Sequence, residues 1–309
     1  MSYKNLPREV RINLLLLIAI LILSLIAWYQ PGLKKVQVHL LSSLKKENIH
    51  HIVLEREFLA SIKLSQVNNH WFMDAPYQLA ANNLRVDTIL ALAEKRSYSQ
   101  FQVSHTDLKT YQLDKPSVSV WLNHQPFILG SNDPIKKQRY AINVKENTGS
   151  DQHTVHLING LIYYQLRAAL NSFISLSLLP PEVKIKSIHW ANKTLTIDNN
   201  QWQLSPKDAQ VSSDSIIQLL QYWQKIQASK VETDISFDIE KKELLTSKSI
   251  IINYMQTTNN GEQQLKTITY AIIQEGSQLK LFRADFNIAY WLSPQQLRYI
   301  TEFMPVKTL

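Results

Sequence analysis

The sequence predicts an α+β protein: an N-terminal transmembrane helix followed by two tandem related subdomains, each a mostly antiparallel sheet with packed helices. Three observations carry this prediction. One uncharged apolar run occupies residues 12–29. Pairs of alternating segments, typical of β-hairpins, recur in both halves of the remaining chain. Each recurrence is followed by a helical pattern, and sheets with helices packed on one face are typical of α+β folds.

Composition narrows the function before any motif is considered. The chain has 309 residues, 45% of them hydrophobic, which is enough for two domains with real cores. It contains no cysteine, which excludes disulfides, thiolate nucleophiles and Cys-ligated metal centres. The formal charge is +8, but the basic residues are scattered in pairs. They indicate solvated surface rather than a nucleic-acid interface.

The apolar run has the length of a membrane-spanning helix. At 1.5 Å per residue it extends about 27 Å, close to the hydrocarbon thickness of a bilayer. Trp28 and Tyr29 close the run where aromatic side chains favour the headgroups, and Pro31 and Gly32 then end the helix. A cleavable signal peptide is the alternative. The length of the run and the bulky residues at the expected cleavage position favour a retained anchor.

Basic residues around the run predict its orientation. Lys4, Arg8 and Arg11 precede it, and Lys34-Lys35 follows it. This is a modest positive-inside bias, and a short N-terminal tail usually decides the topology. We therefore expect the tail in the cytoplasm and the bulk of the chain on the other side of the membrane.

The predicted domain organisation has five parts. They are a cytoplasmic tail (residues 1–11), the transmembrane helix (12–29), a juxtamembrane segment (30–44), a first α+β repeat (45–180) and a second α+β repeat (181–309). The boundary between the repeats falls near Pro180-Pro181. It follows a predicted helix that contains Leu166, Leu170 and Phe173.

Each half opens with a predicted β-hairpin whose second strand begins near a tryptophan. Residues 62–64 lead through a polar turn to Trp71, and residues 195–197 lead through an Asn-rich turn to Trp202. We interpret both tryptophans as core residues that hold each hairpin against its helix, because aromatic side chains bury large areas. Stacking on a sugar or binding of a peptide is the alternative role.

A helix is predicted after each hairpin. Asp87 and Asp214 begin two segments of helical periodicity, and Asp is favourable at a helix start. Both halves close with a strand and a helix, for which Asn159 and Ser293 are the expected N-caps. Further alternating segments between these elements predict strands at residues 118–120 and 250–252.

The same residues carry a resemblance to a known family. The shared pattern is a tryptophan strand, a proline, an Asp helix start, a Tyr-x-Leu-Asp-x-Pro turn, a strand ending in glycine and a late Leu-Arg pair. In this chain these are Trp71, Pro76, Asp87, residues 111–116, Gly130, Leu166 and Arg167. The chain thereby resembles the bacterial domain-of-unknown-function family 4340, over residues 45–300. Gln112 stands where the family has glycine, which implies a different backbone conformation in that turn.

The resemblance implies a location more than an activity. It points to a bacterial envelope protein, anchored in the inner membrane by one helix or attached to a transport assembly such as an ABC-type exporter. No catalytic residues are established for the family, so none is carried over to this sequence.

Residues that could hold a metal or catalyse a reaction lack the required spacing. His50 and His51 point to opposite faces of a strand, and His153 and His156 are not spaced to share a face. We interpret the acidic stretch Glu232, Asp234, Asp238 and Glu240 as solvated surface. A glycosidase whose two acids lie far apart in the sequence stays open. With six glycines and no hydrolase or phosphate-loop motif, we assign no catalytic, cofactor-binding or metal site and expect no cofactor.

The expected function is non-catalytic. It is a membrane-tethered periplasmic module that binds an envelope protein or polymer, or that scaffolds a transport complex. The alternative is a periplasmic hydrolase that acts on glycan or peptide with acidic residues that no motif marks. The lipid bilayer is the expected partner of residues 12–29, and nucleic acid is not an expected partner. We expect any functional surface at the seam between the two halves or along an exposed sheet edge.

Overall fold

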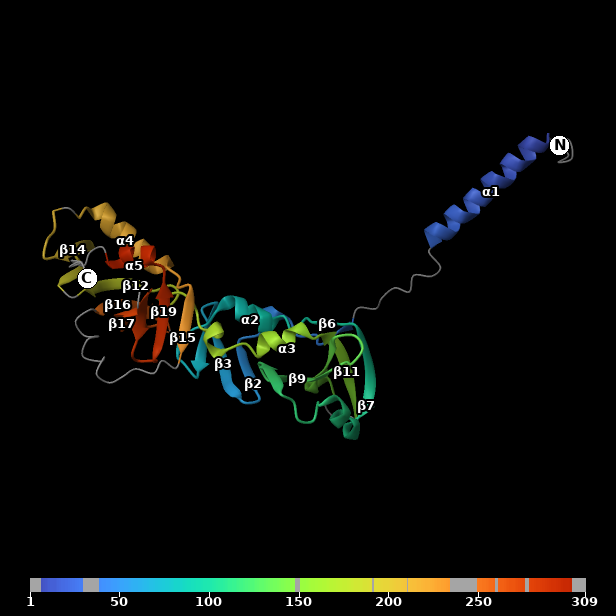
Figure 1. Cartoon of the computed structure of the whole chain (residues 1–309), viewed down its shortest axis with the longest axis horizontal. Coiled ribbons are helices and arrows are strands. Elements are labelled where there is room, and N and C mark those ends of the chain that lie inside the picture. Colours follow the sequence, from blue (N-terminus) through green and yellow to red (C-terminus); the bar gives the residue numbers. More distant parts are fainter. Residues whose placement is uncertain are drawn as a thin grey trace. The chain divides into compact units, whose positions relative to one another are not determined.

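The computed structural model describes residues 7–29, 39–147, 151–190, 192–209, 211–233, 249–258, 261–275 and 278–301. The chain divides into two units, residues 1–38 and 39–309. Figure 1 shows the helices and strands of both.

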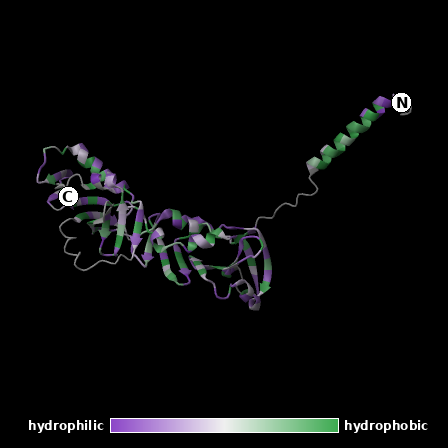
Figure 2. Ribbon diagram, viewed as in Figure 1, coloured by the Kyte–Doolittle hydropathy of each residue, from purple (hydrophilic) through white to green (hydrophobic). Residues whose placement is uncertain are grey.

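The first unit contains the helix α1 (Arg8–Tyr29). Its stretch Arg8–Trp28 is long and apolar enough to cross a membrane. Figure 2 shows hydrophobic residues along the helix, and its large apolar side chains are exposed on all sides. A helix that is apolar all round suits lipid rather than water. The predicted span, residues 12–29, lies within α1.

The second unit begins with β1 (His39–Leu40), which pairs with β6 (Arg96–Ser97). A nine-stranded sheet is then built from described residues, in the spatial order β5-β4-β3-β2-β8-β9-β10-β11-β7. Its strands are β2 (His51–Arg56), β3 (Leu59–Val67), β4 (His70–Ala75), β5 (Leu79–Ala80), β7 (Ser99–Ser104), β8 (Val118–Leu122), β9 (Gln125–Asn132), β10 (Gln138–Asn143) and β11 (Gln152–Asn159).

An eight-stranded sheet follows, in the order β14-β13-β12-β16-β17-β18-β19-β15 for the described residues. Its strands are β12 (Lys184–Trp190), β13 (Lys193–Asp198), β14 (Gln201–Ser205), β15 (Lys230–Thr233), β16 (Ser249–Thr257), β17 (Gln263–Glu275), β18 (Gln278–Arg283) and β19 (Ile288–Leu292). Every strand pair described in both sheets is antiparallel. The predicted α+β class is confirmed.

Helices cover one face of each sheet (Figure 1). The first sheet carries α2 (Asn83–Leu90) and α3 (Leu161–Leu166), and the second carries α4 (Ser213–Lys225) and α5 (Pro294–Thr301). The described 3-10 helices are η2 (Lys46–Asn48), η3 (His105–Tyr111), η4 (Val144–Asn147) and η5 (Leu170–Phe173). The apolar stripe of α4 faces inward as its periodicity predicts, with Leu219 and Trp223 buried.

The two predicted hairpins are confirmed, and their turns explain them. Asn68-Asn69 joins β3 to β4, and Asn199-Asn200 joins β13 to β14. All four asparagines have positive φ, between 48° and 63°. Two consecutive left-handed residues form the turn that best matches the twist of a hairpin, and Asn adopts this conformation more readily than most residues.

The main core is one connected cluster of buried residues that includes side chains from both sheets. Trp71 is only 7% exposed and belongs to it, as predicted. Trp202 is only partly buried and packs against the edge of the cluster, so the expectation of two equivalent core tryptophans is wrong for Trp202. The reason is its strand: β14 is an edge strand, whereas β4 is covered by β5.

Asp87 does not begin a helix. α2 starts at Asn83, and its N-cap is Asn82, whose side chain accepts a hydrogen bond from the backbone N–H of Leu84. Asp87 lies on the exposed side of the second turn. Asn is as good an N-cap as Asp, so the earlier residue takes the role. Asp214 does lie in the first turn of α4, after the N-cap Ser212.

The closing caps differ between the two halves. Ser293 and Gln296 cap α5 reciprocally, since each side chain bonds the backbone N–H of the other. At α3 the N-cap position is Gly160, but Asn159 Oδ1 accepts a hydrogen bond from Leu161 N at 2.9 Å. The predicted role of Ser293 is confirmed, and Asn159 serves the helix start from one position earlier.

The helix predicted through Leu166, Leu170 and Phe173 is interrupted. α3 ends at Leu166 and η5 begins at Leu170, with Ala169 in an extended conformation between them. The carbonyl of Ala168 accepts a hydrogen bond from Arg56 Nη1 at 2.7 Å. This contact takes up a carbonyl that a continuing helix would use, and it comes from a residue more than 100 positions away.

The turn at Gln112 keeps the conformation that a glycine would adopt. Gln112 has φ 55° and ψ 38°, so the expectation of a different backbone there is wrong. The turn packs directly on Gly130: a Cβ at that position would lie 2.1 Å from the carbonyl oxygen of Tyr111. The absence of a side chain at Gly130 therefore allows the turn at residues 111–116 to pack directly against β9.

Candidate functional site

The segment that joins the two sheets is bonded to both of them. On the first side, Asn82 N donates to Phe173 O and Ser175 N donates to Ala80 O, both at 2.8 Å. On the second side, Ala228 N donates to Leu176 O at 2.8 Å. Two further bonds fix the seam: Asn171 Nδ2 to Val231 O at 2.9 Å, and the Tyr270 hydroxyl to Leu178 O. The seam is thus held by backbone and side-chain bonds.

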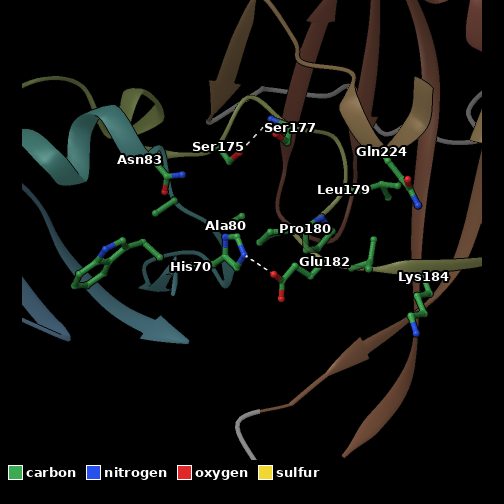
Figure 3. A pocket seen from close by; sticks show the side chains of 14 residues that line it. His70, Ala80, Asn83, Ser175, Ser177, Leu179, Pro180, Glu182, Lys184 and Gln224 are labelled. Atoms are coloured by element: carbon green, nitrogen blue, oxygen red, sulfur yellow. Dashed lines mark hydrogen bonds and ion pairs between the residues drawn. The ribbon is translucent and has the colours of Figure 1, made fainter. Parts of the chain in front are cut away.

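Two cavities open at this seam. The first, which we call the proline cavity, has a volume of about 490 Å³. Figure 3 shows its lining, which comes from β4 and α2 on one side, the joining segment, and β12 and α4 on the other. His70 Nε2 lies 3.2 Å from Glu182 Oε1 across it. Gln224 and Lys184 reach it from the second sheet and its helix.

The second, which we call the strand-end cavity, has a volume of about 760 Å³. It lies where the β3–β4 hairpin meets the ends of β16, β17 and β18. Ala80 and Pro180 line both cavities, so the two are neighbours. The polar lining residues are mostly hydroxyls and amides, beside apolar walls; they include Ser65, Gln78, Gln256, Thr257, Thr258 and Thr267.

One ion pair organises the strand-end cavity. Arg283 bonds Asp285 through two nitrogens, Nε to Oδ1 at 3.1 Å and Nη2 to Oδ2 at 2.5 Å. The guanidinium lies over the ring of Phe286, with Cζ 4.8 Å from the centroid. Phe286 in turn meets Tyr77 of the first half edge-on, at 6.2 Å between centroids. The wall is therefore preformed from side chains of both halves.

Tyr254 and Arg283 are both protonated at neutral pH in the strand-end cavity. Burial raises the pKa of Tyr254; the charge of Arg283 opposes this and that of Asp285 adds to it, and the net shift is upward, so the phenol keeps its proton at neutral pH. Burial alone would lower the pKa of Arg283, but the hydrogen bond with Asp285 and nearby tyrosines outweigh it and the net shift is upward. Beside the exposed charged side chains of Lys266 and Asp74, the cavity thus offers a neutral hydroxyl and a neutralised ion pair to a ligand.

Each carboxylate that lines the cavities already has a partner. Glu182 contacts His70, Asp74 accepts a hydrogen bond from Ser65 Oγ at 2.9 Å, and Asp285 is paired with Arg283. Through these contacts the three carboxylates are linked to neighbouring side chains of the cavity walls.

The histidines considered in the sequence lie elsewhere. His50 Nδ1 bonds Gln66 Oε1 at 2.8 Å. His153 Nε2 lies 3.1 Å from Nδ1 of His105, a residue that the spacing did not single out. His156 is buried, and this burial lowers its pKa to about 4, so it is neutral at physiological pH. Among the residues that the structure describes, no group of three His, Asp or Glu is placed to hold a metal.

The acidic stretch lies only partly within the described residues. Glu232 Oε2 accepts from Trp291 Nε1 at 2.8 Å and from Lys280 Nζ at 3.3 Å. The indole bond is the main cause that lowers the pKa of Glu232. Asp234, Asp238 and Glu240 lie outside the described residues. Glu232 therefore belongs to a side-chain cluster on the second sheet and not to a seam cavity.

Comparison with known proteins gives one finding. The model of a family described as a domain of unknown function (DUF4340) matches residues 71–266. The match begins at Trp71 and covers the joining segment, whereas Arg283, Asp285 and Phe286 of the strand-end cavity lie beyond it. No curated protein matches the chain, and no solved structure does.

Proposed function

Because the chain belongs to the DUF4340 family, whose function is unknown, we propose its role from the geometry: it is a membrane-tethered module that binds a partner in the seam cavities. α1 anchors it in the bacterial inner membrane, with the N-terminal tail in the cytoplasm and the second unit in the periplasm. The partner is an envelope protein or polymer, and the module acts without catalysis, as an accessory of an envelope transport complex.

The observation that carries this proposal is a pair of adjoining cavities lined by both halves. Their volumes, about 490 and 760 Å³, lie in the range of ligand sites, and clefts between domains are common binding places. The hydrogen bonds of the joining segment hold the walls in place before any ligand arrives, which lowers the entropic cost of binding. Hydroxyls, amides and aromatic walls suit an uncharged polymer such as a peptide or a glycan.

Photocrosslinking in the membrane tests the proposal. We expect a photoreactive amino acid at Gln224 in the proline cavity, and separately at Lys266 in the strand-end cavity, to capture the same partner from living cells. Both side chains are exposed lining residues, so replacing them leaves the core intact. The control position is Asp198, an exposed residue at the end of β13 that lines neither cavity.

The readout is a crosslinked species identified by mass spectrometry. Identical products from Gln224 and Lys266, together with a blank at Asp198, would support one partner across both cavities. Products no more frequent at the two cavity positions than at Asp198 would overturn the proposal. A captured glycan or peptide that is consistently shortened, compared with the supplied polymer, would instead support the hydrolase alternative.

We further propose that the two halves are tandem copies of one subdomain. Without β5, the strand order of the first sheet, β4-β3-β2-β8-β9-β10-β11-β7, corresponds position by position to that of the second, β14-β13-β12-β16-β17-β18-β19-β15. The hairpin turns support the same correspondence, since the turn before each tryptophan consists of two asparagines in the left-handed backbone conformation. The spacing from Trp71 to Pro76 is one residue longer than from Trp202 to Pro206, and a bulge in the β3–β4 ladder accounts for it.

An experimental structure should show this duplication directly. Superposing the backbone of residues 45–175 on residues 182–305 is expected to bring Trp71 onto Trp202 and the N-cap Asn82 onto the N-cap Ser212. Asp87 should not fall on Asp214, because the two occupy different positions in their helices. If the tryptophans do not coincide, the shared strand order is a coincidence and the duplication is wrong.

A further inference from the structure

Three arginines lie on the helix-covered side of the first sheet, and Arg167 is close enough to act electrostatically on each of the other two. Arg56 and Arg139 stand in the buried rows of β2 and β10, where the rows are otherwise filled mostly by residues such as Leu54 and Ala141. They are 5% and 6% exposed. Arg167, at the end of α3, is half-buried and adjoins them. We call these three residues the arginine cluster.

The ring of Tyr163 lies between members of the cluster. The guanidinium carbon of Arg139 is 3.5 Å from its centroid, and that of Arg167 is 5.7 Å away. Arg56 lies 5.4 Å from the ring of Phe173. Stacking on aromatic rings and long apolar stems explains how guanidinium groups tolerate this place, but not what balances their charge.

Every hydrogen-bond acceptor recorded for the cluster is an uncharged backbone carbonyl. Arg56 donates to Ala168 O at 2.7 Å and to Ala60 O at 2.6 Å. Arg139 donates to Gly130 O, and Arg167 donates to Ser117 O at 3.3 Å. Within the described ranges, the buried Nε atoms of Arg56 and Arg139 have no hydrogen-bond partner.

The cluster lacks a counter-ion. Across the described part of the chain, no ion pair joins any of its members to Asp or Glu. Burial is the main cause that lowers the pKa of Arg56 and of Arg139; Tyr163 and Tyr164 oppose it at Arg139, while the charge of Arg167 acts in the lowering direction on both arginines. Arginine nevertheless stays protonated at any physiological pH. The charge of Arg167 therefore repels that of Arg56 and that of Arg139, in a place where buried charge is normally paired.

We propose that the arginine cluster is a binding site for a phosphate group. A tetrahedral phosphate group carries one negative charge as a lipid phosphodiester and up to two as free phosphate. It offsets the repulsion and offers several acceptors to guanidinium donors, which bind phosphate in a bidentate manner. The ligand enters beside α3, where Arg167 and Tyr163 are only half-buried and Tyr164 is 62% exposed. The site is independent of the seam cavities, because none of the three arginines lines them.

Thermal unfolding of the full chain in phosphatidylcholine nanodiscs tests this proposal, with inorganic phosphate as the probe. Phosphate should raise the midpoint saturably, relative to chloride at equal ionic strength. At a concentration about ten times Kd, the folding equilibrium constant should rise about elevenfold. Arg167→Gln should remove this response. Arg167→Lys should weaken it, because lysine keeps the positive charge but cannot donate the two parallel hydrogen bonds of a guanidinium group. Arg96→Gln, an equal charge change at an exposed site in β6, should respond as the unsubstituted protein does.

A second arm separates two sources of the phosphate group. Nanodiscs that contain phosphatidylglycerol, in phosphate-free buffer, should raise the midpoint if the natural ligand is a lipid headgroup, and should leave it unchanged if the ligand is soluble. A structural arginine cluster without a ligand would lose stability in Arg167→Gln but would show no anion response to remove. Equal stabilisation by chloride and phosphate, or an undiminished phosphate response in both Arg167 variants, would overturn the proposal.

Discussion

Trp71→Ala is expected to lower the free energy of unfolding of the second unit by about 3–5 kcal/mol, as for other buried large-to-small changes. The indole is 7% exposed and belongs to the main core. It also stands against the joining segment, since it lines the proline cavity. Its removal therefore leaves a void at the point where core and seam meet. Denaturant melts of the full chain in detergent, followed by far-ultraviolet circular dichroism, give the measurement.

Trp202→Ala is the matched control. This tryptophan occupies the same place in the second hairpin, but it lies on an edge strand and is only partly buried. We expect a smaller loss, about 1–2 kcal/mol, from the reduced area withdrawn from water. Equal losses in the two variants would contradict the difference in burial. A negligible loss in both would indicate tryptophans that face a ligand instead of the core.

The sequence was informative wherever local chemistry determines structure. Paired asparagines between alternating segments predicted both hairpins, because Asn readily adopts the left-handed turn conformation. Apolar spacing predicted the buried face of α4, and Ser293 as an N-cap predicted the start of α5. These features depend on residues a few positions apart, so a single sequence contains the whole signal.

The sequence misplaced features that depend on distant contacts. The helix expected through Leu170 is interrupted where Arg56 donates a hydrogen bond to the carbonyl of Ala168. Gln112 adopts a left-handed conformation because its turn must fit against Gly130. Neither contact produces a recognisable sequence pattern near the residue that it affects.

The same limit applies to the candidate sites. The seam was expected as a functional surface, but its lining residues come from segments far apart in the chain, and only Pro180-Pro181 marks it locally. The arginine cluster was missed altogether. Arg56 and Arg139 resemble polar interruptions of strands, and only the sheet places them beside Arg167. A weak signal was available. Side chains alternate between the two faces of a strand, and Arg56 and Arg139 each fall at a position whose side chain points to the buried face.

Interrupting α1 is expected to release the protein from the membrane, the largest change in behaviour that one substitution should produce. The apolar side chains of α1 are exposed on every side, and in the proposed topology lipid covers them. Leu21 lies near the middle of the span, and an arginine there costs about 2.5–3.5 kcal/mol on insertion scales. Leu21→Arg should therefore shift much of the protein out of carbonate-washed membranes, whereas Leu21→Ala should leave it there.

The same cells test orientation and retention. Alkaline phosphatase fused after Pro31 should be active, since the basic residues before the span favour a cytoplasmic N-terminus. N-terminal sequencing of the mature protein should find residues that precede Arg11. A mature chain that begins after Ala27 would show that α1 is a cleaved signal, and the tether would then be lost. The seam cavities would remain, but their partner would have to reach a protein that diffuses freely, rather than one held at the membrane surface.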